Sequence, residues 1–139
     1  TGISAKSASH PVFTNNEVKG NGEYGIMIRM ACTPVFEKNK ILQNPIGIYT
    51  APSGTAQPDI GGGGRSTGGN EFDNYEWNIY HRGPVDISAK KNSWGSPCCE
   101  GIHEKIYDKE DDSLSGTVDV GTCMICTASL SVRPVVNTS

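Results

Sequence analysis

Short apolar pairs and single asparagines recur along this chain at a nearly constant interval. Four isoleucines follow a glycine or an asparagine, at Ile3, Ile26, Ile48 and Ile79. Four asparagines come after them, at Asn16, Asn39, Asn70 and Asn92. The step from Ile to Asn is 13 residues in three of the four units. A repeat of 22–23 residues predicts a fold of stacked structural units, so it constrains the architecture before any other feature does.

The repeated segments have the composition of β-strands. Residues 25–28, 47–50 and 78–81 form one set, and residues 11–18 and 34–41 form another. Both sets are rich in β-branched and aromatic residues, and both are too short for helices. Leucine-rich repeats are excluded because the chain has only Leu42, Leu114 and Leu130. Ankyrin and tetratricopeptide repeats are helical and longer. The sequence therefore predicts an all-β solenoid of about four coils whose strands pair in parallel.

In such a solenoid, equivalent residues stack about 4.8 Å apart along the axis. We expect Ile3, Ile26, Ile48 and Ile79 to form one inward column, and Val18, Ile41, Phe72 and Trp94 to form another. The four repeated asparagines fall at a turn, where Asn tolerates the left-handed conformation and its amide can bond to the next one as a ladder. Their predicted role is therefore structural.

One unit is longer than the others. The step from Ile48 to Asn70 is 22 residues, nine more than the standard step, and the excess lies near the glycine-rich segment 52–69. We expect residues 53–68 to leave the coil as an exposed loop. The segment lacks the Gly-Lys-[Ser/Thr] ending of a phosphate-binding loop, which favours a long turn.

The remainder of the chain differs from the repeat. We expect coils over residues 1–97 and a C-terminal cap and tail over residues 98–139, with helical turns at 101–107 and a short strand within 117–126. No comparable cap precedes Ile3. An uncapped coil exposes unpaired backbone groups, so we expect a homo-oligomer formed through the N-terminal end, or a further coil upstream.

Overall composition excludes several function classes. The formal net charge is −3 and the pI is near 5.5, so nothing favours nucleic-acid binding. No apolar run is long enough to cross a membrane. At 139 residues the chain is expected to form one domain.

The unit Pro-x-Phe-x-x-Asn-x-[Val/Ile] followed by Gly-Ile resembles the right-handed parallel β-helix repeats of pectate-lyase-like bacterial proteins. Residues 58–63 with 69–72, the Asn-Ser-Trp-Gly at 92–95 and residues 106–118 also resemble segments of that family. The resemblance implies a right-handed coil and favours an extracellular or cell-surface location. It does not define an activity, because this fold hosts lyases, hydrolases, epimerases and adhesins.

Two function classes follow from this resemblance. The first is a non-catalytic structural or carbohydrate-binding module whose contact surface would be aromatic and basic. The candidate residues are Tyr49, Tyr75, Trp77, Tyr80 and Arg82, with Tyr24 on an equivalent segment. We favour this class because no set of catalytic residues converges in the sequence.

The second class is a polysaccharide-active enzyme, either a lyase or a glycoside hydrolase, or a terminal fragment of one. A hydrolase would need paired carboxylates, for which Asp73 and Glu76 are candidates. A lyase would need a base, such as Arg29 or His81, with calcium as the one cofactor left open. The acidic run at 108–112 lacks the spacing of an EF-hand, which favours a solvated turn.

Five cysteines leave three alternatives open. Cys98, Cys99, Cys123 and Cys126 lie in the cap, and Cys32 stands alone in the repeat. The four cap residues are consistent with free packed thiols, with a disulfide between the 98–99 pair and the 123–126 pair, or with a zinc site.

Overall fold

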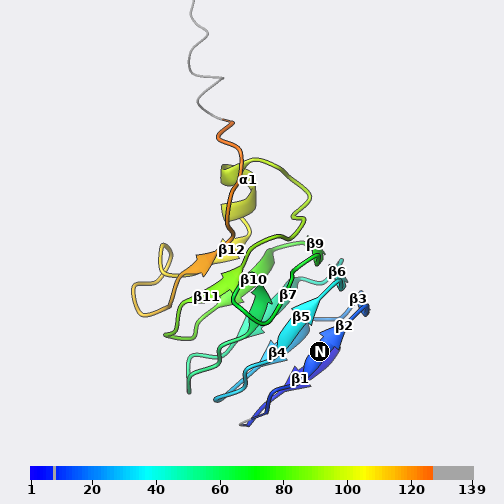
Figure 1. The fold of residues 1–139 in the computed structure, drawn as a ribbon, viewed down its shortest axis with the longest axis vertical. Helices are drawn as coiled ribbons and strands as arrows, with labels where there is room; N and C mark the ends of the chain where they lie inside the picture. Colours follow the sequence, from blue (N-terminus) through cyan, green and yellow to red (C-terminus); the bar gives the residue numbers. More distant parts are fainter. Residues whose placement is uncertain (8, 127–139) are drawn as a thin grey trace, which may run out of the picture.

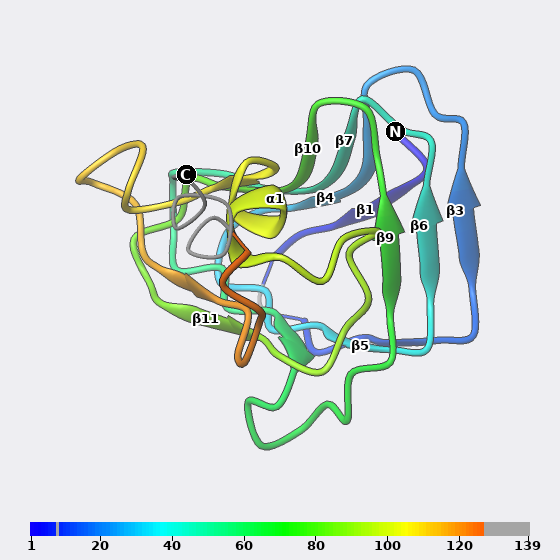
Figure 2. The same ribbon diagram turned by 90° about the horizontal axis from the view of Figure 1, so that it is seen from above.

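The computed structural model describes residues 1–7 and 9–126, which form a parallel β-helix (Figure 1). Sheet A contains β1 (Ile3–Ala5), β4 (Tyr24–Ile28), β7 (Ile46–Thr50), β10 (Trp77–His81) and β12 (Ile106–Tyr107). Sheet B contains β2 (Val12–Thr14), β5 (Val35–Glu37), β8 (Asp59–Gly61), β11 (Ile87–Ala89) and β13 (Val118–Asp119). Sheet C contains β3 (Glu17–Lys19), β6 (Lys40–Leu42) and β9 (Glu71–Asp73), which form one wall of the coil in Figure 2. Every pairing between these strands is parallel, as the repeat predicts.

The two predicted inward columns are confirmed. The strand register pairs Ile3 with Ile26, Ile26 with Ile48 and Ile48 with Ile79, and it continues into the cap at Ile106. In sheet C, Val18 pairs with Ile41 and Ile41 with Phe72, and the ring of Trp94 stacks on Phe72 at 4.7 Å between centroids. Identical or similar side chains therefore fill each level of a narrow core.

The predicted asparagine ladder is also confirmed. From Asn39 onward, the side-chain Oδ1 of each asparagine accepts two hydrogen bonds from the asparagine one coil earlier, one from its backbone N–H and one from its Nδ2. These bonds join Asn16, Asn39, Asn70 and Asn92 at 2.9–3.2 Å. The ladder thereby satisfies buried amide groups at a turn in every coil.

A second asparagine ladder was not anticipated. It joins Asn21, Asn44, Asn74 and Asn78 with the same pair of hydrogen bonds at each step. The glycines that precede the column isoleucines leave room for it. A Cβ on Gly47 would lie 2.5 Å from the carbonyl oxygen of Asn78 and 2.6 Å from Nδ2 of Asn74. Asn78 replaces this glycine in the next coil, and its own side chain completes the ladder.

The prediction of an exposed loop over residues 53–68 is wrong. The middle of this segment forms β8, which pairs with β5 and β11. Ile60 and Ala56 are fully buried. The nine extra residues are therefore shared between two turns, one before and one after β8. The periodicity count located the excess correctly but could not show that a strand lay inside it.

The glycine-rich turn after β8 is organised by one buried carboxylate. Asp59 accepts backbone hydrogen bonds from Gly61, Gly63, Arg65 and Ser66 at 2.8–3.1 Å. Burial alone would raise the pKa of Asp59, but these four amides together hold its pKa below its ordinary value. Because the amides of the turn are directed at its own aspartate, the turn offers no ready phosphate cradle.

The cap differs from its predicted secondary structure. Its helix is α1 (Cys99–His103), so the helical turns expected at 101–107 begin earlier, and Ile106 lies in β12 instead. The expected strand within 117–126 is limited to Val118–Asp119. The strands β12 and β13 extend sheets A and B as a partial fifth coil. No helix in the described part of the chain is long and apolar enough to cross a membrane.

The acidic run is only partly a solvated turn. Asp108 is buried, and its carboxylate accepts the backbone N–H groups of Glu110 and Val118. Glu110 and Asp111 are exposed, as expected. The turn is therefore built around an aspartate that the protein itself satisfies.

Among residues 1–7 and 9–126, no strand pairs with the outer edge of β1, β2 and β3, and Val12 is 64% exposed there. Association through this edge is not tested by a single chain and stays a prediction.

The second ladder makes a testable prediction about glycine. Gly47→Ala should lower the free energy of unfolding by about 2–4 kcal/mol, because the added methyl group meets backbone and ladder atoms that cannot move independently. Gly22→Ala is the matched control, since a Cβ there meets nothing within 4 Å. Urea unfolding of both variants measures the difference, and equal stabilities would refute the packing role of Gly47.

Candidate functional site

Aromatic side chains line the outer face of sheet A. The register places Tyr49, Tyr80 and Tyr107 at one position of three successive strands. A second outward position, nearer the start of each strand, holds Tyr24 in β4, Ile46 in β7 and Trp77 in β10. All five aromatic side chains are half-buried. We call Tyr24, Tyr49, Trp77, Tyr80 and Tyr107 the aromatic column.

The rings of the column contact one another without a gap. Tyr24 stacks on Tyr49 at 4.7 Å, Tyr49 lies tilted at 5.7 Å from Tyr80, and Tyr80 stacks on Tyr107 at 4.2 Å. Trp77 meets Tyr80 and Tyr107 edge to face. A ligand would therefore meet the outer ring edges, the phenol hydroxyls and the exposed part of the indole, on a surface that its own packing holds rigid.

Arg82 places a positive charge beside this column. It follows β10, and its backbone N–H donates to the carbonyl oxygen of Thr50. Its guanidinium donates to the Tyr49 hydroxyl, and this hydrogen bond, with the nearby phenols, raises the pKa of Arg82. Arg82 is thus a permanent cation suited to binding a carboxylate or a hydroxyl, and it is unsuited to removing a proton.

The structure brings together four of the five predicted carbohydrate-contact residues. Tyr49, Trp77, Tyr80 and Arg82 share one face, whereas Tyr75 lies in the turn between β9 and β10. Tyr75 is 68% exposed and takes part in none of the ring contacts of the described residues. The sequence reading missed Tyr107, although Ile106-Tyr107 repeats the Ile-Tyr pairs at 48–49 and 79–80.

His81, a candidate base in the lyase hypothesis, points into the core and is fully buried. Its Nε2 donates to the carbonyl oxygen of Val85 at 2.6 Å, and its Nδ1 accepts the Thr50 hydroxyl at 2.6 Å. Burial lowers the pKa of His81, against smaller opposing effects of the Val85 hydrogen bond, Asp108 and Asp86. Both ring nitrogens of this neutral imidazole are in use, so His81 is a structural residue.

Two carboxylates influence tyrosines at the two ends of the aromatic column. Glu23 raises the pKa of Tyr24, after the larger effect of burial, and Asp112 similarly contributes at Tyr107. Those tyrosines lie three strands apart, which corresponds to about 14 Å. Glycosidase pairs lie about 5–9.5 Å apart. The candidate Asp73 lies in β9 of sheet C, whereas Glu76 precedes β10 of sheet A, so the structure places the predicted pair at two different sheets.

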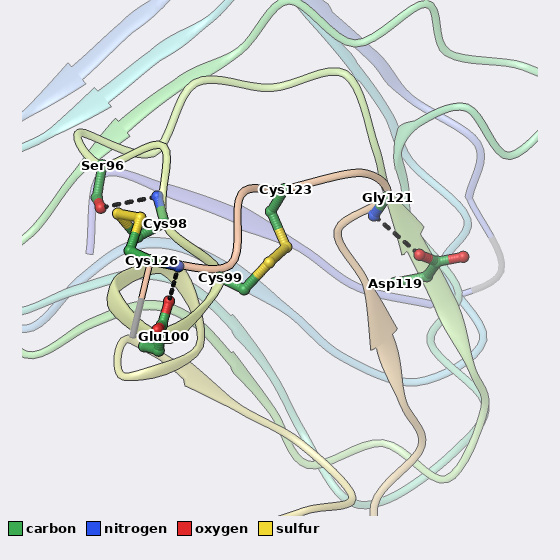
Figure 3. The surroundings of a disulfide bond; sticks show 8 residues. All are labelled: Ser96, Cys98, Cys99, Glu100, Asp119, Gly121, Cys123 and Cys126. Carbon is green, nitrogen blue, oxygen red and sulfur yellow. Dashed lines mark hydrogen bonds between the residues drawn. A yellow bond between two sulfur atoms is a disulfide. The ribbon is translucent and has the colours of Figure 1, made fainter. Parts of the chain in front are cut away.

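The four cap cysteines form two disulfides (Figure 3). Cys98 is bonded to Cys126, and Cys99 to Cys123, while Cys32 is free and buried. Of the three alternatives, the structure has the disulfide one, and both residues of the 98–99 pair are bonded to residues of the 123–126 pair. Free thiols in the cap are excluded in this state.

The disulfides also bear on the zinc alternative. Cys98, Glu100 and Cys126 have potential ligand atoms within 4.8 Å of one another, and they are the only such group in the described residues. Two of these atoms are disulfide sulfurs, which are not thiolates and do not ligate zinc as cysteine normally does. The oxidised cap therefore has no zinc site of the predicted kind.

Comparison with known proteins identifies the fold family. The family described as right handed beta helix region matches residues 1–75, more than half of the chain. The chain therefore belongs to the right-handed β-helix family. No curated protein and no solved structure matches the chain. The match covers the coils that carry Tyr24 and Tyr49 and ends before Trp77, so it supports the fold and assigns no role to the aromatic column.

The buried imidazole predicts a pH dependence. Because the folded-state pKa of His81 is lowered, the unfolded chain takes up a proton first as the pH falls below about 6.5. Stability should therefore decrease from pH 6.5 downward, by at most about 1.4 kcal/mol per pH unit from this group. His81→Gln should remove this component of the slope, and His103→Gln, an exposed control, should retain it. Urea unfolding at pH 7, 6 and 5 measures the slopes, and equal slopes in all three proteins would contradict the assignment.

The disulfides predict a mass and a labelling pattern. The unreduced protein should lack four hydrogens relative to the fully reduced chain, because each of the two bonds removes two. Alkylation after unfolding without reductant should label Cys32 alone. Intact-mass spectrometry measures both quantities, and five labelled thiols in freshly purified protein would show that the cap is reduced.

Proposed function

We propose that this protein is a non-catalytic carbohydrate-binding β-helix whose ligand lies along the outer face of sheet A. The observation that carries the proposal is the aromatic column itself, which runs over four successive strands with Arg82 beside it. Aromatic residues that are half-exposed on a sheet face and present hydroxyls outward suit a ligand with both apolar and hydroxylated surfaces. An elongated polysaccharide has that character.

The direction of the column favours an extended ligand. Successive rings follow the stacking axis of the solenoid, so contacts repeat at the strand spacing of about 4.8 Å. The hydroxyl of Tyr49 is held by Arg82, and Tyr107 is hydrogen-bonded to Tyr80. A rigid, preordered surface of this kind loses little conformational entropy when it binds.

The placement of the predicted acid pair at two different sheets and the permanent charge of Arg82 favour binding over cleavage. The two disulfides suit an oxidising compartment, which supports an extracellular or cell-surface location.

Binding is tested with a panel of immobilised neutral and uronic-acid polysaccharides. Tyr80→Ala should weaken binding of any retained glycan about tenfold or more, because it removes the central ring of the column. Tyr75→Ala is the matched control and should bind as the parent does. Arg82→Gln should weaken only acidic glycans. Equal loss in the Tyr75 and Tyr80 variants, or no retained glycan at all, would refute the proposal.

The same glycans test for catalysis. We expect no absorbance of unsaturated product and no new reducing ends, with or without calcium. If the parent cleaves a glycan and Tyr80→Ala does not, the protein is a polysaccharide-active enzyme and not a binding module.

A further inference from the structure

Sheet C has three strands, whereas sheets A and B have five each. β12 adds a fifth level to sheet A and β13 adds one to sheet B. In sheet C, β9 is followed only by a bridge between Glu71 and Ser93, and no further strand of the described residues pairs with 92–94. A groove of about 620 Å³ lies there, between residues 91–97 and the cap residues Ile102, Val120 and Met124. We call it the sheet C groove.

At the floor of the groove, part of the backbone has no hydrogen-bond partner among the residues that the structure describes. Ser93 directs both of its backbone groups back to the previous coil, donating to Asn70 at 2.9 Å and accepting from Phe72 at 2.8 Å. Alternate residues of a parallel strand bond to opposite neighbours, so Asn92 and Trp94 direct their N–H and C=O groups to the groove side. Among the residues that the structure describes, these backbone groups have no hydrogen-bond partner.

The asparagine ladder shows which group is missing. The backbone N–H of Asn16, Asn39 and Asn70 is bonded in each case to Oδ1 of the next asparagine. The N–H of Asn92 ends this series without its acceptor. In the preceding coils, the C=O of each ladder asparagine also accepts a hydrogen bond from the next coil. The donor is the backbone N–H of the residue that follows the asparagine of that coil, as Ser93 donates to Asn70.

Applied one coil further, this pattern defines a ligand. An incoming strand with the sequence Asn-X-apolar would accept the Asn92 N–H on its Asn Oδ1. Its residue X would donate its N–H to the Asn92 carbonyl and accept the Trp94 N–H on its own carbonyl. Its apolar residue would lie against Trp94, as Trp94 lies against Phe72. Addition of a strand to an open sheet edge is an established mode of peptide recognition.

We propose that the sheet C groove binds an extended Asn-X-apolar segment of a partner polypeptide as an added parallel strand. A second copy of this chain fits less well. Its most exposed segment of this kind, 16–18, is joined in one coil to β1 and β2. Docking that coil in register would place β1 and β2 where β12 and β13 already lie. The partner segment must therefore be free of a coil.

The test uses the complete, oxidised, ¹⁵N-labelled protein and a capped peptide, Lys-Asn-Lys-Ile-Leu, which copies residues 38–42. Saturable amide shifts should centre on Asn92 and Trp94, and both amides should gain protection from hydrogen exchange. Two control peptides are the same sequence with an N-methyl group on its third residue, and with Ala in place of Asn. Each should bind about tenfold more weakly, because each loses a hydrogen bond that the groove needs.

A pair of protein variants separates the groove from the rest of the surface. Met124→Asp should weaken binding, because Met124 lines the groove and is 60% exposed, so the substitution introduces charge with little effect on folding. Leu114→Asp, at a residue that is 81% exposed in the cap turn, should leave binding unchanged. No shift at millimolar peptide, or equal binding of the N-methyl peptide, would refute the proposal. If the protein alone self-associates, with shifts at the same amides that the peptide reverses, the occupant of the groove is a second copy instead.

Discussion

The structure depends on the requirement that each coil pair its backbone with the next coil at a spacing of about 4.8 Å. That spacing places each residue directly against its counterpart one repeat away, so every position must tolerate a neighbour of its own kind. Isoleucines meet this requirement by packing, and asparagines meet it by donating to and accepting from one another. Both asparagine ladders bond the backbone N–H and the side-chain Nδ2 of one coil to a single oxygen of the next. The ladders therefore fix the register at two turns of the coil while the isoleucines fill its interior.

The outer face of sheet A follows from the same constraint. When tyrosines occupy one outward position in successive strands, their rings must contact, and the result is a continuous column instead of separate aromatic residues. Its rigidity comes from the backbone spacing, and its charge comes from a single arginine that the column itself holds. The buried carboxylates of Asp59 and Asp108 work differently, since they organise irregular turns by accepting four and two backbone amides respectively. Regular stacking and carboxylate-centred turns together account for most of the polar groups in the interior.

The cap closes the solenoid unevenly. Two short strands attach it to the last coil over sheets A and B, and two disulfides cross-link the cap internally. At sheet C the last level ends with backbone groups directed into a groove. The proposed carbohydrate surface on sheet A and the proposed polypeptide groove at sheet C thus lie on different faces of the molecule. Both result from the stacking of equivalent coils. A stack of equivalent levels presents a regular face along its length and an incomplete level at its end.

The sequence by itself determined the coil, because residues that recur at a fixed interval in a parallel stack must coincide in space. The isoleucine column, the Phe72–Trp94 stack and the first ladder could all be read from spacing. The second ladder was harder to predict from the sequence, because its last member, Asn78, comes only four residues after Asn74. Asn78 also occupies the position before Ile79, which is a glycine in the earlier coils. Only the tertiary structure showed that β8 lies inside the longer unit, that His81 faces inward, and that Tyr107 joins the column while Tyr75 does not. These outcomes depend on where an irregular turn returns the chain to the stack. That is decided by contacts between residues far apart in the sequence, such as the Ser66 hydroxyl with the Phe36 carbonyl and the cysteine pairs of the cap.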